Sequence, residues 1–196
     1  MRVIGGRWRG TALAGLGTGD PAAALRPTSD RVRENLFNLL AHGDYGDPPP
    51  PEGRRVLDLF AGTGALGIEA LSRGAVAATF VDQGRAALGL LRRNLDRLGV
   101  GEEARVVPRD ATRLGRNPGA PFDLVFLDPP YGRGLGERAV AAAMAGAWVA
   151  RGALVVWEEG VDHPVLPGLT RLDSRRYGET MIAIFRSTAP LPVPAP

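Results

Sequence analysis

The chain of 196 residues contains no cysteine and no lysine. The absence of cysteine excludes a disulfide framework, a thiolate-bound zinc or iron–sulfur centre and a thiol nucleophile. Long hydrophobic runs are also missing: the longest, residues 139–150, ends at Arg151 and is too short to span a bilayer. The first residues lack the apolar core of a secretion signal. We therefore expect a cytoplasmic protein with no membrane partner.

The composition that remains is that of one folded domain. Hydrophobic residues make up 44% and charged residues 23%, which is close to the average for globular proteins. The net charge is +3, and residues 1–40 account for all of it, with six arginines against three acidic residues. This excess fits the docking of a polyanion at the N-terminus, and solvated surface charge explains it equally well.

Three regions can be separated along the chain. Residues 1–42 predict a small extension, with a hairpin over Arg2–Leu13 and a helix that is capped at Thr28, Ser29 or Asp30 and runs to about Ala41. A proline-rich boundary follows, and residues 54–186 form the main domain. Residues 187–196 carry four prolines and are expected to be a disordered tail.

The main domain alternates strands with helices, which indicates a parallel, doubly wound α/β sheet. The expected strands are residues 55–59, 76–81, 104–107, 122–127 and 153–157, and the expected helices are 64–73, 85–98 and 136–150. The last two strands, 169–176 and 180–186, meet at a short turn and predict an antiparallel hairpin at the sheet edge. The whole is a seven-stranded, mostly parallel sheet.

A glycine-rich turn follows the first of these strands, where residues 58–67 read DLFAGTGALG. Gly62, Gly64 and Gly67 satisfy the G-x-G-x-x-G pattern, and Asp82 ends the next strand at the position of a ribose-binding acid. A tight turn without a ligand gives the same pattern, and a nicotinamide dinucleotide is a rival ligand. The carboxylate of Asp58 favours S-adenosylmethionine, because it suits a cationic amino-acid group and would repel a pyrophosphate.

Asp110 and Ala111 follow the third strand, where they could hydrogen-bond an adenine. Asp110 could equally be an ordinary helix N-cap. Glu158 and Glu159 end the fifth strand, and we expect them to be surface carboxylates rather than part of a cleft. His42 and His163 are isolated, and no metal site is expected.

The sequence Asp128-Pro129-Pro130-Tyr131 comes directly after an apolar strand and carries most of the chemistry. Two prolines make the loop rigid, and it belongs at the carboxyl edge of the sheet, where α/β folds bind ligands. The Asp128 side chain and the Pro129 carbonyl can accept both hydrogens of an exocyclic amino group and so aim its lone pair at a methyl sulfonium. Tyr131 offers a ring on which a flipped base can stack.

With these motifs together, the chain resembles the RsmD-type 16S ribosomal RNA (guanine-N(2))-methyltransferases, a family of class I S-adenosylmethionine-dependent enzymes with a Rossmann-like fold. The most specific blocks are residues 2–10 (RVIGGRWRG), 25–38 (LRPTSDRVRENLFN) and 58–75 (DLFAGTGALGIEALSRGA). The resemblance implies methylation of the 2-amino group of one guanine in 16S ribosomal RNA. The implied partner is the small ribosomal subunit or a late assembly intermediate, and we expect a monomer.

The resemblance also assigns residues by position. The cofactor-binding set is Asp58, Phe60, Ala61, Gly62, Thr63 and Gly64 for the methionine end, Asp82 and Gln83 for the ribose, and Asp110 and Ala111 for the adenine. The catalytic set is Asp128, Pro129, Pro130 and Tyr131, and the RNA-binding set is Arg2, Arg7, Trp8, Arg9, Arg26, Arg31 and Arg33. Gln83 replaces a more usual charged residue, which leaves the contacts at the ribose edge open.

Two alternatives remain. The loop at Asp128 alone fits an adenine-N(6) methyltransferase acting on DNA or RNA, but the N-terminal blocks and the lack of a separate target-recognition domain disfavour it. A catalytically silent ribosome-assembly binding protein is the other alternative, and the intact loop motifs disfavour that one.

Overall fold

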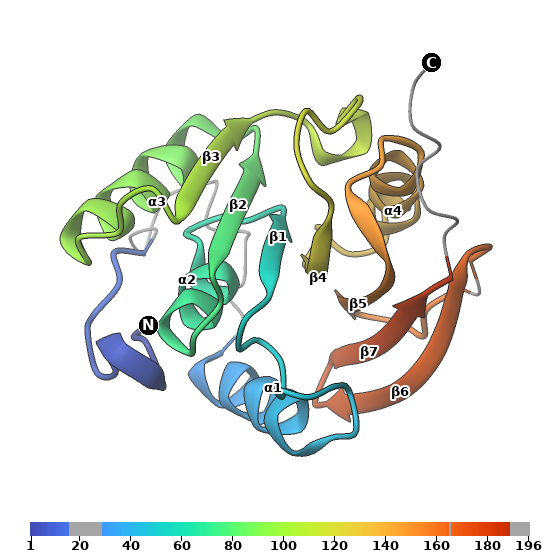
Figure 1. Ribbon diagram of the computed structural model, residues 1–196, viewed down its shortest axis with the longest axis horizontal. Coiled ribbons are helices and arrows are strands. Elements are labelled where there is room, and N and C mark those ends of the chain that lie inside the picture. Colours follow the sequence, from blue (N-terminus) through green and yellow to red (C-terminus); the bar gives the residue numbers. More distant parts are fainter. Residues whose placement is uncertain (16–28, 165, 189–196) are drawn as a thin grey trace.

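The computed structural model describes residues 1–15, 29–164 and 166–188. They form a seven-stranded sheet with the strand order β3-β2-β1-β4-β5-β7-β6 and with helices packed against it (Figure 1). The strands are β1 (Arg55–Leu59), β2 (Ala77–Asp82), β3 (Ala104–Pro108), β4 (Phe122–Leu127), β5 (Val149–Glu159), β6 (Leu169–Tyr177) and β7 (Thr180–Ser187). The helices are α1 (Asp30–His42), α2 (Ala65–Ser72), α3 (Arg85–Arg97) and α4 (Leu135–Ala145), with one-turn 3₁₀ helices η1 (Gly6–Trp8) and η3 (Ala111–Arg113).

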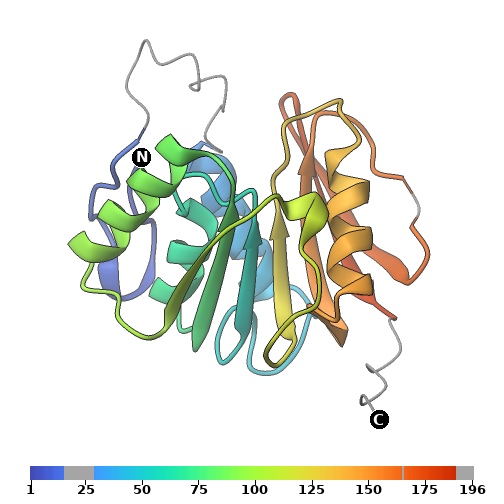
Figure 2. The ribbon, with the colours of Figure 1, turned by 90° about the horizontal axis from the view of Figure 1, so that it is seen from above.

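Strands β1 to β5 pair in parallel, whereas β7 runs antiparallel to both β5 and β6. The predicted mostly parallel sheet with an antiparallel C-terminal hairpin is therefore confirmed. Because β1 lies between β2 and β4, the chain runs outward from β1 in one direction and then returns to its other side. Figure 2 shows the strands side by side, with helices packed on both faces of the sheet.

Each face of the sheet has its own hydrophobic core, which follows from the alternation of side chains along a strand. Val56 of β1 points to the face covered by α1, α2 and α3, where Phe37 and Phe80 are also buried. Leu57 and Leu59 point to the opposite face, which η3 and α4 cover. Complete burial of such a side chain contributes about 1.5–3 kcal/mol to the free energy of unfolding.

Two expected elements differ in the structure. The N-terminal hairpin is a single antiparallel bridge between Arg2 and Ala12 that encloses η1, because Gly6 and Gly10 take positive φ angles and turn the chain twice. The helix predicted over residues 136–150 ends at Ala145. Trp148 enters the core there and stacks on Phe122, so β5 begins where the alanine-rich pattern alone would continue the helix.

Glu69 of α2 holds the N-terminal segment against the main domain. Its buried carboxylate accepts hydrogen bonds from the backbone nitrogens of Ile4 (2.7 Å) and Gly5 (2.8 Å) and from Nε of Arg73 (2.7 Å). Ser72 adds two more contacts, with the backbone of Gly5 and of residue 8. Residues 1–15 thus share the core of the sheet domain, on the face covered by α2.

Among the described residues, no helix combines the length and the apolar character that crossing a membrane requires.

We expect Glu69→Ala to lower the free energy of unfolding by about 2–4 kcal/mol, because it leaves three donors without their acceptor in a buried site. Urea denaturation measures this difference. Glu102→Ala, at an exposed position, is the matched control and should change the free energy of unfolding by no more than about 0.5 kcal/mol. An equally small change in Glu69→Ala would contradict the anchoring role.

Candidate active site

The carboxyl ends of the parallel strands bring three expected site positions, together with Glu158, into one row. Leu59 is in register with Val81 and with Leu127, so the residues that follow β1 and β4, Phe60 and Asp128, leave the sheet side by side. Asp82 ends β2 on one side of this pair. On the other side Glu158 follows in β5, because Leu127 is in register with Trp157. The row therefore combines the glycine-rich turn and the Asp128 loop at neighbouring strands.

The glycine-rich turn has a backbone conformation that few side chains allow. Gly62 and Gly64 have φ angles of 55° and 82°, and Phe60 has a φ of 59°, which is unusual for a residue with a β-carbon. A Cβ at Gly67 would lie 2.3 Å from the ring of Phe80 and 3.0 Å from Oδ2 of Asp58. Gly67 thus lets α2 pack directly on the strands, whereas Gly62 and Gly64 shape the turn.

Asp58 is buried beneath this turn. Its Oδ2 accepts a hydrogen bond of 2.9 Å from the backbone nitrogen of Gly67, at the beginning of α2. The pKa of the carboxyl is raised to about 7, mainly because of burial; the hydrogen bond from Gly67 opposes the shift, and the charge of Asp82 adds to it. A carboxylate in this position gains most from a nearby cation, which would offset the cost of its desolvation.

Asp82 fastens the turn to the end of β2. Its Oδ2 accepts from the backbone nitrogen of Gly62 (2.8 Å), and its Oδ1 accepts from that of Gly84 (2.7 Å). Each carboxylate oxygen can accept a second hydrogen bond, so the group can hold the loop and still receive two hydroxyls. Gln83, the next residue, is exposed.

Asp110 is the N-cap of η3. Its Oδ1 accepts from both the backbone nitrogen and the hydroxyl of Thr112, each at 2.8 Å, and the backbone hydrogen bond is the main cause that lowers the pKa of this carboxyl. Ala111 is buried against the adjacent core. The N-cap interpretation of Asp110 is therefore correct. A contact of Asp110 or Ala111 with adenine stays a prediction.

Two glutamates at the end of β5 accept hydrogen bonds from the loop that begins at Asp128. The hydroxyl of Tyr131 donates to Oε1 of Glu158 at 2.8 Å, and the backbone nitrogen of Gly132 donates to Oε1 of Glu159 at 3.1 Å. The Tyr131 ring lies over Gly160, where a Cβ would be 2.8 Å from it, and remains 41% exposed. Partial burial is the main cause of the raised pKa of Tyr131, so its hydroxyl stays protonated.

The expectation that Glu158 and Glu159 lie at the surface is wrong, since both are buried. They end an eleven-residue strand, β5, that pairs on both sides, with β4 and with β7. The sequence carried one signal of this position: the pair of glutamates directly follows the hydrophobic run of residues 153–157, which is typical of a central strand. The hydrogen-bonding partners in the loop were not visible from that pattern.

Asn94 is a second polar residue that sequence reasoning missed. It is completely buried in α3, and its Nδ2 donates to the carbonyl oxygens of Thr63 (2.9 Å) and Ala14 (3.2 Å). Its Oδ1 accepts from the backbone nitrogen of Ala14 at 2.7 Å. One amide therefore ties the N-terminal segment to the glycine-rich turn. The available signal was a polar residue on the apolar face of an otherwise amphipathic helix.

The N-terminal arginines do not form one free basic surface. Arg33 is completely buried, where it hydrogen-bonds the carbonyl of Arg2 and forms an ion pair with Asp30, so its assignment to an RNA-contacting surface is wrong. Arg7 pairs with Glu103 and lies 3.8 Å from the ring centre of Trp8, which packs against the core. The exposed arginines of the set are Arg2, Arg7, Arg9 and Arg31, while Arg26 lies outside the described residues.

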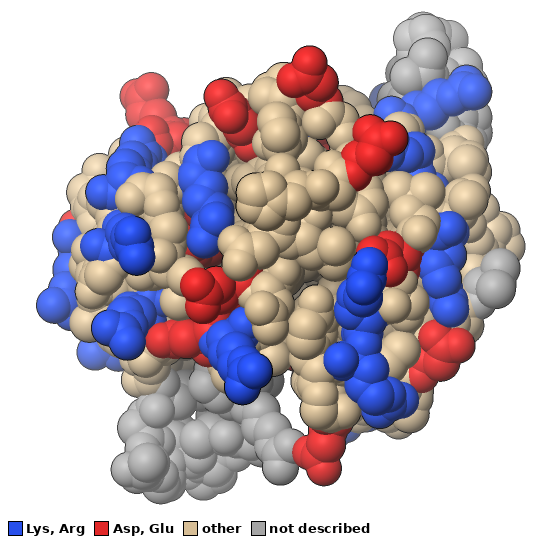
Figure 3. Space-filling model, turned by 90° about the horizontal axis from the view of Figure 1, so that it is seen from below, with Lys and Arg blue, Asp and Glu red and all other residues tan. Residues whose placement is uncertain are grey.

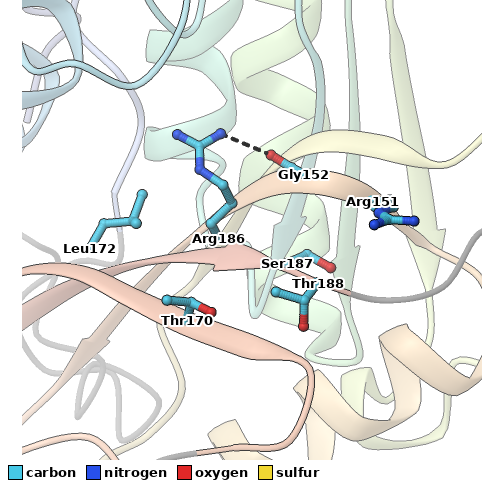
Figure 4. A pocket seen from close by; sticks show the side chains of 7 residues that line it. All are labelled: Arg151, Gly152, Thr170, Leu172, Arg186, Ser187 and Thr188. Atoms are coloured by element: carbon cyan, nitrogen blue, oxygen red, sulfur yellow. Dashed lines mark hydrogen bonds between the residues drawn. The ribbon is translucent and has the colours of Figure 1, made fainter.

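The pocket drawn in Figure 4 is at the opposite, amino-terminal edge of the parallel strands. Arg151 and Gly152 come from the start of β5, and Thr170 and Leu172 from β6. Nη1 of Arg186 donates to the carbonyl oxygen of Gly152 at 3.4 Å. This pocket contains none of the residues of the row described above. Within the described part of the chain, no group of three or more His, Asp and Glu side chains is arranged to hold a metal ion.

Comparison with known proteins gives concordant matches. The family model described as conserved hypothetical protein 95 matches residues 1–186. Ribosomal RNA small subunit methyltransferase D of Escherichia coli is 42% identical over 169 residues, which cover 85% of this chain and 79% of that protein. The protein of the same name from Haemophilus influenzae is 37% identical over 85% of this chain and 82% of its own length. A solved structure of an Escherichia coli protein described as a methyltransferase aligns with a TM-score of 0.79 at 38% identity, and covers 97% of this chain and 99% of that one.

We expect Asp58→Asn to remove a pH-dependent cost of folding. The carboxyl binds a proton up to about pH 7 in the folded chain, whereas in the unfolded chain its ordinary pKa is 3.8. Because the unfolded state loses its proton first, this group lowers the free energy of unfolding as the pH rises from about 4 to 7.

The stability of Asp58→Asn relative to the original chain should therefore increase by about 2–3 kcal/mol between pH 5 and pH 8, measured by urea denaturation without added ligand. Asp96→Asn, at an exposed position, serves as the control. A difference that stays constant over this pH range would contradict the raised pKa of Asp58.

Proposed function

The chain belongs to the family described as conserved hypothetical protein 95, in which it is similar to the ribosomal RNA small subunit methyltransferases D, and on this premise we propose its reaction. It transfers a methyl group from S-adenosylmethionine to the 2-amino group of a guanine in 16S ribosomal RNA. The substrate is the small ribosomal subunit or a late assembly intermediate. The observation that carries the proposal is the Asp128–Tyr131 loop, which leaves the sheet next to the turn above Asp58.

The residues around the glycine-rich turn fit S-adenosylmethionine. Asp58, whose buried carboxylate gains from a cation, would face the methionine end together with the backbone of residues 60–64. Asp82 has acceptor capacity left for the ribose hydroxyls. Asp110 and Ala111 follow β3, two strands from β1, on the side where an adenine would lie. When bound, the cofactor supplies a methyl group on a positively charged sulfur.

Asp128 and Pro129 act on the target nitrogen. The lone pair of an exocyclic amino group is delocalised into the base, which makes the nitrogen a poor nucleophile. The Asp128 carboxylate and the Pro129 carbonyl would accept one N–H each, and this geometry favours a pyramidal nitrogen whose lone pair points along the row toward the glycine-rich turn. Catalysis is then positioning together with electrostatic stabilisation of the charge that develops on the nitrogen.

Tyr131 holds the plane of the base. Its ring is confined by Gly160 on one side, and its hydroxyl by Glu158, so the orientation of the exposed part of the ring is set before the base arrives. A guanine that has left its stack would regain stacking energy of about 1–3 kcal/mol on this ring. Glu158 does not touch the base in this arrangement and acts as a positioning residue.

Labelled methyl transfer to undermethylated small subunits, to naked 16S RNA and to DNA tests the proposal. The RNA is then digested and the modified nucleoside identified. Guanosine methylated on its 2-amino group, formed on the particle, supports the substrate and the chemistry together. Formation of methyladenosine or of labelled DNA would contradict the proposed guanine target, although the protein would still be an amino methyltransferase. Cofactor binding without transfer to any substrate would favour a silent binding protein.

We expect Asp128→Ala to reduce kcat by a factor of about 10²–10³ in this assay, because the amino group loses its charged acceptor. Its affinity for S-adenosylmethionine, measured by calorimetry, should stay within about threefold, since the glycine-rich turn is unchanged. Asp44→Ala, at an exposed residue before β1, is the control and should match the original chain. Turnover near that of the original chain in Asp128→Ala would remove Asp128 from the mechanism.

Tyr131→Phe and Tyr131→Ala separate stacking from hydrogen bonding. Phenylalanine keeps the ring over Gly160 and should retain kcat/KM for the particle within about fivefold, whereas alanine should lose about tenfold to a hundredfold. Steady-state kinetics on the small subunit provide both values. Equal losses in the two variants would show that the bond to Glu158, rather than the ring, carries the effect.

A further inference from the structure

Helix α3 carries an arginine face that the proposed mechanism does not use. Arg85, Arg92, Arg93 and Arg97 are all exposed, and at 3.6 residues per turn they fall within an arc of about 140°. The opposite side of the helix is buried. Asp96 is the one acidic residue of the helix and lies within the same arc, which leaves an excess of positive charge. We call these four residues the α3 arginine face.

Within the described residues, no ion pair engages any of these four arginines. Three exposed or partly exposed arginines elsewhere on the molecule do have acidic partners: Arg7 pairs with Glu103, Arg171 with Asp162 and Arg175 with Asp173. Figure 3 shows basic side chains gathered both on the side of the molecule that carries the N-terminal segment and on the side of β6. On β6 the ion pairs of Arg171 and Arg175 compensate part of the positive charge. Within the described residues, no such ion pair compensates the positive charge of α3.

The helix also leads away from the row of site residues. It begins directly after Gly84, whose backbone nitrogen donates to Asp82 in that row, and it returns alongside the parallel strands. With a rise of about 1.5 Å per residue, Arg97 lies about 18 Å along the helix from Arg85. Asp128 directly follows β4, which lies two strands from β2, a distance of about 10 Å across the sheet. One nucleic-acid chain can therefore reach both places.

We propose that the α3 arginine face binds the phosphate backbone of the ribosomal RNA that flanks the target guanine. The inference rests on the proposed function and adds the surface that holds the substrate. Guanidinium groups bind phosphate oxygens through paired hydrogen bonds, and such contacts fix position and orientation without reading sequence. The carboxylates of the site row repel phosphate, so the backbone must be held beside the site rather than in it.

The test compares two double variants that remove the same charge. Arg92→Ala/Arg93→Ala alters the α3 arginine face. Arg116→Ala/Arg151→Ala is the control and removes two exposed arginines elsewhere, one before β4 and the other in the pocket at the amino-terminal edge. Binding to undermethylated small subunits and to naked 16S RNA is measured by filter retention between 50 and about 200 mM KCl, the range over which phosphate contacts show in the salt dependence.

The α3 variant is expected to bind both the particle and the naked RNA about tenfold more weakly at the lower salt concentration. Its slope of log affinity against log salt should decrease by about 1–2, which corresponds to one or two lost phosphate contacts. The control variant should keep the original affinity and slope. Affinity for S-adenosylmethionine and kcat at saturating particle should be unchanged in both variants, because neither pair touches the row of site residues.

Three outcomes would overturn the inference. Unchanged binding and slope in the α3 variant would remove the helix from the interface. Equally weakened RNA binding in the control variant would show that the loss of affinity comes from the change in net charge and not from the α3 arginine face. A loss on the particle alone, with naked RNA binding intact, would assign α3 to an acidic protein surface of the subunit. Failure of the original chain to methylate the particle would instead refute the proposed function, and it is recognised before any variant is compared.

Discussion

The direct pairing of β1 with β4 is the constraint on which the candidate site depends. The chain builds β1, β2 and β3 outward in one direction and then returns to place β4 on the other side of β1. The helical coverings consequently lie on different faces, α2 and α3 on one and η3 and α4 on the other. The turn after β1 and the loop after β4 leave the sheet at this reversal, where the carboxyl ends of open α/β sheets bind ligands.

Charge is separated on this molecule in a way that fits a cationic cofactor and an anionic substrate. Carboxylates gather along the carboxyl edge, where Asp58, Glu158 and Glu159 are buried. Backbone N–H groups and the Tyr131 hydroxyl satisfy them, so that the negative charge is held in place by the loops that it orders. The α3 arginine face runs from this edge alongside the parallel strands. A polyanion can therefore approach the site without its phosphates entering the acidic row.

The N-terminal segment illustrates how a charge pattern can serve packing. The arginines of residues 1–40 suggested a docking surface, but Arg33 is buried and forms an ion pair with Asp30, and Arg7 forms an ion pair with Glu103. Asn94 and Glu69 bind the backbone of this segment from α3 and α2, and Asn94 also reaches the glycine-rich turn. A segment that is so closely attached to the turn is part of the site's framework, and the four arginines of α3, which form no ion pair within the described residues, lie on the neighbouring helix.

The amino-acid sequence alone determined the alternation of strands and helices, the antiparallel closing hairpin, the glycine-rich turn and the Asp128 loop. These are local patterns: burial periodicity, conformational restriction by glycine and proline, and residue spacing within one turn. Only the tertiary structure decided that Glu158 and Glu159 support the Tyr131 loop, that Arg33 is buried and that Asn94 joins two distant segments. The end of α4 was likewise decided by the packing of Trp148 on Phe122. Each of these depends on a partner distant in the sequence, and a local pattern contains no information about which distant residue will supply the hydrogen bond, the counter-charge or the packing surface.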